Sequence, residues 1–552
     1  MKDNKARDNF IMQAGILAAA GMVTRIIGLL YRSPLHSVIG KLGDGYYSSA
    51  YNFYTIILLI SSYSIPSAIS KVLAQKLAVE EYRNAHRLFK CALFYVLGVG
   101  AAASLFLFFA AELFVSPEAV PVLRTFAPTI FVYGILGVLR GYFQAQRTMV
   151  PTSVSQIIEQ IANAVISVGG AYVLIHFVLG DVSGLPEKAA QVQTGVYGAV
   201  GSAIGTGAGV VAALLFMLFV FFASKKHMDK KILADTHTEV DSYGTIMKTI
   251  FLVVTPFIIN TAVCNLSSNV NNTLYTKIYP AVRGLDTLDT YSAYGLYSLQ
   301  AVTISNIPIA FATAMAAAMI PTVAQLIAAQ KREVAKDKIA LAVKATMVIS
   351  IPCAVGLFTL AAPVTSLLFR NPPEDELVAA KLLMALSLSV IFFAYSTLNS
   401  QILQGLGKVN APIVNAGIAL VVQSILAAVL LFFTPLDMYS IAIASTVYSG
   451  LLCFLNQRSV HKAIGYEQEI ENTFIRPLTA AVLMGVFCKI IYSIFFWMTR
   501  SPKLSVLIAI AIGAGFYFAV LVLLKGVTEE ELRSFPKGHL LVKIAKKCRL
   551  IR

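Results

Sequence analysis

Charged residues are scarce in this chain, and their scarcity excludes an ordinary water-soluble fold. Asp, Glu, Lys and Arg make up 13% of the 552 residues, whereas hydrophobic residues make up 57%. A soluble domain usually carries about 25% charged residues. Apolar runs of about 20 residues recur along the whole length, and each can cross a hydrocarbon layer of about 30 Å as a helix. The composition therefore predicts an integral membrane protein.

The apolar runs lack the strict alternation of apolar and polar residues that a transmembrane barrel requires. Backbone groups in lipid must be satisfied internally, so a helical bundle is the remaining solution. We therefore predict an all-α protein of about fourteen transmembrane helices. The predicted spans begin near Ile11, Tyr46, Phe89, Val120, Pro151, Gly195, Ile246, Tyr291, Leu341, Leu377, Ala411, Met438, Thr473 and Leu504.

Cysteine is also rare, and its placement indicates neither a disulfide framework nor a zinc site. The six cysteines lie in predicted spans or in the C-terminal tail, and no CxxC spacing occurs. We expect no metal and no cofactor.

Acidic residues are outnumbered by basic ones, 28 against 44, which gives a net charge of +16. The basic residues gather in alternate connections, in clusters at 71–90, 225–231, 331–344 and 537–552. This asymmetry follows the positive-inside rule and does not indicate nucleic-acid binding. We predict that both termini are cytoplasmic, and that the basic tail contacts anionic lipid headgroups.

Two stretches resemble each other at a separation of 255 residues, as in transporters built from repeated halves. Ile65-Pro66 precedes Gln75-Lys76 at the spacing at which Ile320-Pro321 precedes Gln330-Lys331. A second echo, with a one-residue shift, pairs Gln144, Arg147 and Pro151 with Gln404, Lys408 and Pro412. We interpret these echoes as a parallel repeat, and chance similarity among apolar segments is the alternative.

The repeat and the charge clusters predict a division of the chain. We expect a first lobe at 1–224, a cytoplasmic linker at 225–245, a second lobe at 246–460, two further helices at 461–526 and a basic tail at 527–552. The connections between spans are too short to hold a soluble catalytic domain.

Arg25 lies well inside the first predicted span, where a charge costs roughly 2.5 to 3.5 kcal/mol. Helical spacing places Ala14, Ala18, Gly21, Arg25, Gly28 and Arg32 on one face. One interpretation is a packing seam whose arginines cap carbonyls or pair with a carboxylate. The other is a cationic wall whose guanidiniums bind phosphate oxygens bidentately. We favour the second, because few intramembrane acids are present to neutralise both arginines.

The seventh predicted span repeats this spacing with uncharged polar groups. Thr261, Asn265, Ser268 and Asn272 follow the same four, three, four spacing. Amides and hydroxyls suit sugar hydroxyls or a cation bound through oxygens. Hydrogen bonding between helices is the alternative for each residue. In the eighth span, Asn306 places an amide beside Pro308, at a predicted kink.

Glu159 lies in the fifth predicted span, among other polar residues. It is a candidate carrier of a coupling proton or sodium ion, and also a candidate charge partner of Arg25. The sequence leaves these two roles open.

Several of these motifs resemble a known family. They are the run from Gly21 to Arg32, the glycine-rich turn from Gly40 to Gly45, and the pair Glu159-Gln160. The chain resembles the polysaccharide exporters of the multidrug/oligosaccharidyl-lipid/polysaccharide superfamily. The closest likeness is to the Gram-positive lipid II flippases and the stage V sporulation protein B group, which are related to MurJ. It covers essentially the whole chain.

The resemblance implies two six-helix lobes arranged as a V around a central cavity, with two extra C-terminal helices. It also implies outward movement of undecaprenyl-diphosphate-linked sugars by alternating access, with Arg25 and Arg32 facing the diphosphate. This chain departs from the family in two places. Ser33 stands where many members carry an acid, and Gln300 lies near a position where they carry a further arginine.

We therefore expect a lipid II flippase and not an enzyme, acting as a monomer in the bacterial cytoplasmic membrane. Its expected partners are the bilayer and a lipid-linked sugar diphosphate, and membrane potential, protons or sodium are the candidate driving forces. Other functions stay open: export of capsule-type or teichoic-type lipid-linked units, multidrug export, and membrane glycosyl transfer. The candidate substrate-binding residues are Arg25, Arg32, Asn265, Ser268, Asn272, Gln300 and Asn306.

Overall fold

The computed structural model describes residues 20–63, 65–146, 148–182, 184–235, 241–328, 330–529 and 543. Every regular element in these ranges is a helix. Ten of the described helices are long and apolar enough to span a membrane. The all-α membrane fold is thereby confirmed, and the count of fourteen spans stays a prediction.

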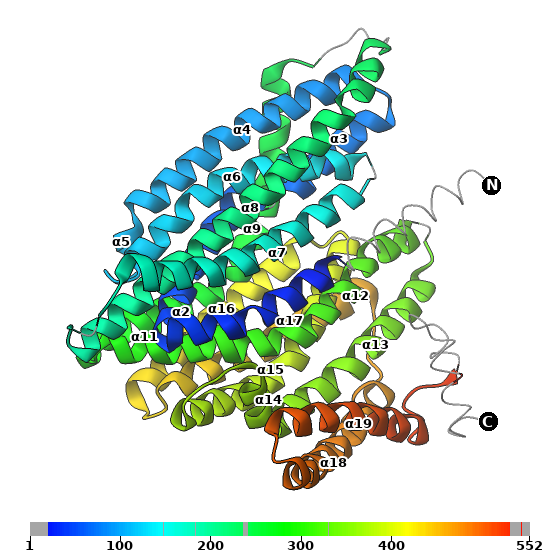
Figure 1. The fold of residues 1–552 in the computed structure, drawn as a ribbon. Helices are drawn as coiled ribbons and strands as arrows, with labels where there is room; N and C mark the ends of the chain where they lie inside the picture. Colours follow the sequence, from blue (N-terminus) through cyan, green and yellow to red (C-terminus); the bar gives the residue numbers. More distant parts are fainter. Residues whose placement is uncertain are drawn as a thin grey trace. The chain divides into compact units, whose positions relative to one another are not determined.

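The chain divides into two compact units, Met1–Gly295 and Leu296–Arg552. The described part of the first unit begins with the helix Ala20–Leu30. Its other elements are α2 (Arg32–Leu58), η1 (Leu59–Tyr63), α3 (Ile65–Ala78), α4 (Tyr82–Phe109), α5 (Ala111–Phe114), α6 (Val120–Ala145), α7 (Val150–Val173), η2 (Leu174–Leu179), α8 (Glu187–Leu233), α9 (Tyr243–Thr273), η3 (Leu274–Ile278), α10 (Tyr279–Arg283) and α11 (Thr287–Gly295) (Figure 1).

The second unit is also helical. It contains η4 (Leu296–Val302), α12 (Thr303–Ala328), α13 (Arg332–Thr359), α14 (Ala361–Leu368), α15 (Pro373–Gly405), α16 (Asn410–Phe433), α17 (Met438–Ile464), η5 (Glu471–Ile475), α18 (Arg476–Thr499) and α19 (Pro502–Leu523). The last two helices pack on each other, and α18 also packs on α13 (Figure 1).

The boundary at Gly295 lies beyond the linker expected at 225–245, because α9 packs on the first unit. Ile246 and Ile250 of α9 join a buried core with Phe89 of α4 and Tyr142 of α6. The compact units therefore do not coincide with the lobes expected from the sequence, and the lobe assignment stays a prediction.

A helical hairpin lies within α2, where Gly40 has φ 68° and ψ 177°. Glycine tolerates this left-handed φ without the steric cost that a Cβ brings. His36 before the bend and Asp44 after it are both buried, with His36 Nδ1 2.5 Å from Asp44 Oδ2. The glycine-rich turn singled out in the sequence is thus a sharp reversal closed by a buried imidazole–carboxylate pair.

The two units share an order of elements. Helices α4 and α13 each have 28 residues, and α13 begins and ends 250 residues after α4. The turns before them carry the non-glycine residues Glu80 (φ 61°) and Gln330 (φ 58°). This 250-residue offset agrees with an internal repeat and differs by five residues from the 255-residue echo in the sequence, and the repeat stays a prediction.

Candidate functional site

The two predicted arginines lie near the junction of the first helix and α2. Arg25 is exposed, and it forms no ion pair within the described ranges. Arg32 is partly buried, and its charge acts on the Tyr47 and Tyr51 hydroxyls. A Cβ added at Gly28 would lie 3.1 Å from Gln160 Nε2, so the first helix approaches α7 at Gly28, whereas nothing lies within 4 Å of a Cβ at Gly21. Ala14 and Ala18 of the predicted face lie outside the described residues.

Glu159 of α7 pairs with Arg140 of α6. Arg140 Nη2 donates to Glu159 Oε2 at 2.7 Å, and Arg140 Nε donates to Ser155 Oγ at 2.9 Å. The Arg140 side chain is 5% exposed and that of Glu159 is 24% exposed. Charge partner of Arg25 was one of two roles left open for Glu159, and it is corrected, because its partner is Arg140. A coupling role for Glu159 stays a prediction.

Arg140 was not predicted as a site residue, although it shares the feature that singled out Arg25, which is a charge inside an apolar run. Arg140 interrupts an apolar run that continues from Ile135 to Phe143, and an intramembrane cation needs an acid or an aqueous space. The spacing within α6 does not reveal its partner, because Glu159 lies on the next helix.

Hydroxyl and amide groups continue this polar region between α7, α8 and α2. The Tyr47 hydroxyl lies 3.1 Å from Thr206 Oγ1, which donates to Asn163 Oδ1 at 3.3 Å. Asn163 Oδ1 also accepts from Ser167 Oγ at 2.8 Å. Close helix packing brings them together, since a Cβ at Gly205 would lie 2.3 Å from the Ser167 backbone nitrogen.

An aromatic cluster joins α2 and α6, and the charges of Arg32 and Glu159 act on its Tyr51 hydroxyl. Tyr47, Tyr54 and Phe126 are buried, whereas Tyr51 is partly exposed. The Tyr51 ring stacks on Tyr47 with centroids 5.7 Å apart, and it meets Phe126 edge-on at 5.8 Å. Aromatic residues are common in apolar spans, so the sequence gave no reason to single these out.

The polar row predicted on the seventh span divides in the structure. Asn272 is fully buried, and its Nδ2 donates to Ser49 O at 3.2 Å and to Ser49 Oγ at 3.0 Å. Asn265 and Ser268 are exposed. Thr261 lies in a helical stretch whose side chains are not described. Asn272 therefore joins α9 to α2, and substrate contact by any of these residues stays a prediction.

The two candidates of the eighth span lie in the second unit. Gln300 is fully buried and exchanges two hydrogen bonds with Asn371, at 3.1 and 2.8 Å. Asn306 is exposed on α12. The amide of Gln300 is thus engaged within the protein, in the region where related proteins are expected to carry an arginine.

Helices α2 and α11 approach each other closely within the first unit. A Cβ at Gly45 would lie 1.9 Å from Tyr291 O, and one at Gly295 would lie 2.3 Å from Lys41 O. Asn52 Nδ2 donates to the Tyr294 hydroxyl at 2.7 Å. We call these contacts, together with the Asn272–Ser49 bonds, the α2–α11 seal. In the predicted topology they lie toward the external side.

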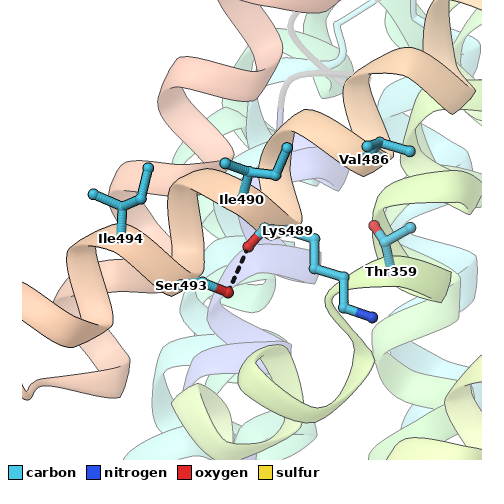
Figure 2. Close-up of a pocket in the computed structure, with 7 residues that line it drawn as sticks. Thr359, Val486, Lys489, Ile490, Ser493 and Ile494 are labelled. Carbon is cyan, nitrogen blue, oxygen red and sulfur yellow. Dashed lines mark hydrogen bonds between the residues drawn. The ribbon is translucent and has the colours of Figure 1, made fainter.

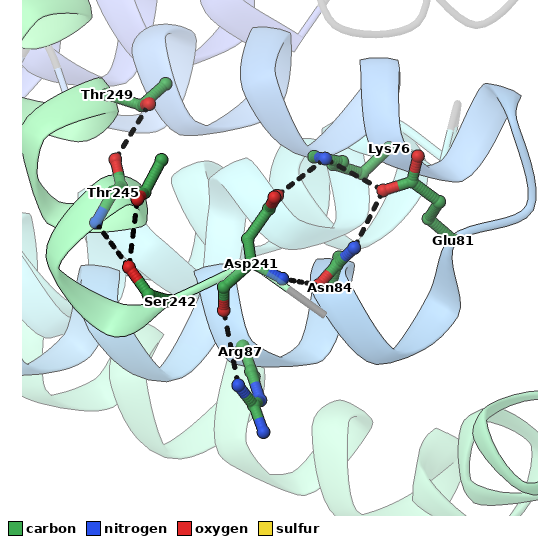
Figure 3. A network of polar contacts seen from close by, with 8 residues as sticks. All are labelled: Lys76, Glu81, Asn84, Arg87, Asp241, Ser242, Thr245 and Thr249. Carbon is green, nitrogen blue, oxygen red and sulfur yellow. Dashed lines mark hydrogen bonds and ion pairs between the residues drawn. The ribbon is translucent and has the colours of Figure 1, made fainter. Parts of the chain in front are cut away.

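The opposite end of α9 is held by an ionic network (Figure 3). Lys76 Nζ lies 2.7 Å from Asp241 Oδ2 and 2.8 Å from Glu81 Oε2. The Asp241 backbone nitrogen donates to Asn84 Oδ1 at 2.9 Å, and Arg87 Nη1 donates to Asp241 O at 3.2 Å. We call this network the linker clamp. It holds the segment before α9 against the turn between α3 and α4.

A cavity of about 400 Å³ lies between α13 and α18 in the second unit (Figure 2). Its walls are mainly apolar, and the Lys489 side chain extends along it toward Thr359 (Figure 2). None of the predicted site residues lines it.

Comparisons with known proteins agree with this architecture. The family model described as "Polysaccharide biosynthesis protein" matches residues 11–327, and the MatE model matches residues 295–429. The chain is 23% identical to "Lipid II flippase MurJ" of Bacillus subtilis (strain 168) over 538 residues, covering 94% of this chain and 95% of that protein. It is 25% identical to "Stage V sporulation protein B" of the same organism over 550 residues, covering 98% and 100%.

A solved structure titled "Lipid II flippase MurJ, inward closed conformation" shares the fold. Its TM-score is 0.63 at 16% sequence identity, and the match covers 93% of this chain and 97% of that one. The fold thus defines a multi-pass helical membrane protein that is similar in fold to MurJ. The chain belongs to the polysaccharide biosynthesis protein family.

Proposed function

We propose that this protein moves an undecaprenyl-diphosphate-linked cell-wall precursor, lipid II, outward across the bacterial cytoplasmic membrane. The name of one full-length relative, "Lipid II flippase MurJ", supports a lipid-linked substrate. The chemistry of the first unit supports an anionic one, because Arg25 is exposed and Arg32 is partly accessible.

The observation that carries the proposal is the placement of Arg32. Arg32 is partly buried at the start of α2, and its charge acts on the hydroxyls of Tyr47 and Tyr51. Glu159 already has a cation in Arg140, whose Nη2 lies 2.7 Å from Glu159 Oε2. Guanidinium forks bind phosphate oxygens bidentately, so a diphosphate fits this chemistry.

The headgroup crosses by alternating access, in which the protein opens first to the cytoplasmic side and then to the external side. In the described state the α2–α11 seal is closed on the predicted external side, so the headgroup enters from the cytoplasmic side. Outward release requires Gly45 to part from Tyr291 and Asn272 to part from Ser49. The polyprenyl tail stays in the bilayer, so the diphosphate does not enter hydrocarbon unaccompanied. A potential positive outside assists anion export by about 2.3 kcal/mol per charge per 100 mV.

Complementation of a bacterium depleted of its own lipid II flippase tests this function. The wild-type chain should restore growth, and the variant with Arg25→Ala and Arg32→Ala should not. Arg124→Ala is the matched control, because Arg124 pairs with Glu112 on the protein surface. Normal growth with the double variant, at equal membrane abundance, would reject the assigned role of the arginines.

Multidrug export is the second candidate, because the MatE model matches part of the second unit. A drug exporter should raise the resistance of a sensitive host to cationic drugs. A flippase should leave resistance unchanged while restoring wall synthesis.

A further inference from the structure

The partly exposed ring of Tyr51 stands out in an otherwise buried aromatic cluster. Tyr47 is held by its hydroxyl contact with Thr206, and Tyr54 stacks on Phe126 with centroids 4.7 Å apart. Tyr51 contacts all three of these rings. Its position is therefore fixed by a rigid aromatic base, while part of its own surface stays accessible.

Packing contacts bring charged groups of opposite sign toward this ring. The Tyr47 hydroxyl is linked through Thr206 Oγ1 to Asn163 of α7, and Tyr51 and Glu159 each lie one helical turn from these two residues. A Cβ at Gly28, one turn before Arg32, would lie 3.1 Å from Gln160 Nε2, next to Glu159 in the chain. Arg32 and Glu159 also both act electrostatically on the Tyr51 hydroxyl. In a sugar diphosphate, the first sugar ring is attached directly to the phosphate. When Arg32 binds the diphosphate, that sugar ring must therefore lie next to Arg32.

Glu159 has the geometry of a hydrogen-bond acceptor for that sugar. Arg140 takes Oε2, and Ser155 holds Arg140 in turn. Within the described ranges Oε1 accepts no hydrogen bond, and the side chain is 24% exposed. A carboxylate oxygen fixed in this way can accept from a sugar hydroxyl or from an acetamido N–H.

We propose that Tyr51 and Glu159 form a sugar subsite beside Arg32, with Tyr51 as the platform for the first sugar ring and Glu159 as its hydrogen-bond acceptor. Aromatic faces are electron-rich, and they attract the polarised C–H groups that one side of a pyranose ring presents. The subsite rests on the proposed function, because it binds the sugar that the diphosphate carries.

Equilibrium binding of two lipids to the purified full chain in nanodiscs tests the subsite. The probes are undecaprenyl diphosphate and the same lipid carrying the N-acetylmuramyl-pentapeptide and N-acetylglucosamine units of lipid II. Tyr51→Leu should weaken binding of the sugar-bearing lipid about threefold to tenfold and leave undecaprenyl diphosphate unaffected. Tyr51→Phe keeps the ring and should bind both lipids as the wild type does.

Two further variants separate the subsite from the proposed function. Glu159→Gln should reduce the preference for the sugar-bearing lipid, whereas Arg32→Gln should weaken both lipids together. Tyr172→Leu is the matched control, because Tyr172 is an exposed tyrosine on the outer surface of α7. If Tyr51→Leu does not fold, Tyr51→Met carries the same prediction.

The subsite would be overturned if Tyr51→Leu bound the sugar-bearing lipid as tightly as the wild type does. It would also be overturned if Tyr51→Leu lost affinity for both lipids by the same factor. Failure of the wild-type protein to bind either lipid would instead overturn the proposed function. The two failures are therefore distinguishable in one set of measurements.

Discussion

At the scale of single residues, the interior of the first unit is organised by pairing. His36 with Asp44 is a buried pair within α2, and Arg140 of α6 with Glu159 of α7 is a partly buried one. Removing one member of a buried ion pair leaves an uncompensated charge, which costs about 3 to 5 kcal/mol, whereas removing both is often nearly neutral. Replacing one member of such a pair should therefore lower stability more than replacing both.

Arg140→Met should destabilise the protein by about 3 kcal/mol, because Glu159 then keeps a charge in a largely apolar setting. The double variant with Glu159→Gln should recover most of the loss. Thermal unfolding in detergent, followed by circular dichroism, measures both. A double variant no more stable than Arg140→Met would contradict the pairing.

Residue chemistry also explains which site residues the sequence could predict. Arg25, Arg32 and Glu159 could be predicted, because a charge inside an apolar run is costly unless it pairs with another charge or faces a ligand or water. Asn272 was recognised by its spacing, but its contact with Ser49 depends on packing between α9 and α2. Tyr51 carries no such signal, because a tyrosine costs little in a membrane span. Arg32 and Glu159, whose charges act on Tyr51, lie far apart from each other in the sequence, so their common effect on it could not be predicted.

At the scale of elements, glycine determines where helices meet. Gly45 of α2 and Gly295 of α11 lie where a Cβ would reach a backbone oxygen of the other helix. A backbone atom cannot move aside as a flexible side chain can, so a methyl group there must separate the helices.

Gly45→Ala should weaken the α2–α11 seal and lower the unfolding temperature by several degrees, because an overpacked contact costs about 1 to 3 kcal/mol. Gly98→Ala on α4 is the matched control, since nothing lies within 4 Å of its added Cβ. The control should be neutral or stabilising by about 0.5 to 1 kcal/mol. Equal unfolding temperatures for Gly45→Ala and Gly98→Ala would show that the seal is not tight.

The linker clamp gives a pH-dependent prediction at the same scale. Burial lowers the pKa of Lys76, but its hydrogen bonds to Asp241 and Glu81 outweigh burial, so the pKa of Lys76 is raised above 10.5. A raised lysine pKa means that the clamp contributes full stability below pH 10.5 and loses it as pH rises through the folded-state pKa.

The wild type should therefore unfold at a higher temperature than Lys76→Met at neutral pH, and the difference should shrink above about pH 10.5. Lys336→Met is the control, because Lys336 forms only a local pair with Glu333, four-fifths of whose side chain is exposed. A difference that does not change with pH would argue against the ionic clamp.

The order of elements could largely be predicted from apolar run lengths, whereas their packing could not. Span positions follow from composition, because lipid admits few folds. The echoes at Pro66 and Pro321 predict an offset of 255 residues between the halves, whereas the turns at Glu80 and Gln330 are 250 residues apart. The association of α9 with the first unit depends on Ile246 and Ile250 entering a shared core.

At the scale of the whole molecule, the proposed transport cycle requires the α2–α11 seal to open. Cysteines at Ser49 and Asn272, introduced into a cysteine-free background and joined by a short thiol reagent, should stop transport, and cleavage of the cross-link should restore it. Cysteines at Glu112 and Arg124 are the control, because these residues pair without crossing the seal. Undiminished transport with the Ser49–Asn272 cross-link in place would show that these helices do not part.

The most direct test of the central claim is headgroup accessibility in proteoliposomes that contain the purified chain and lipid II. The wild type should expose inner-leaflet lipid II to an external glycan-modifying probe, and the variant with Arg25→Ala and Arg32→Ala should do so no faster than protein-free liposomes. Equal rates for that variant and the wild type would contradict the account.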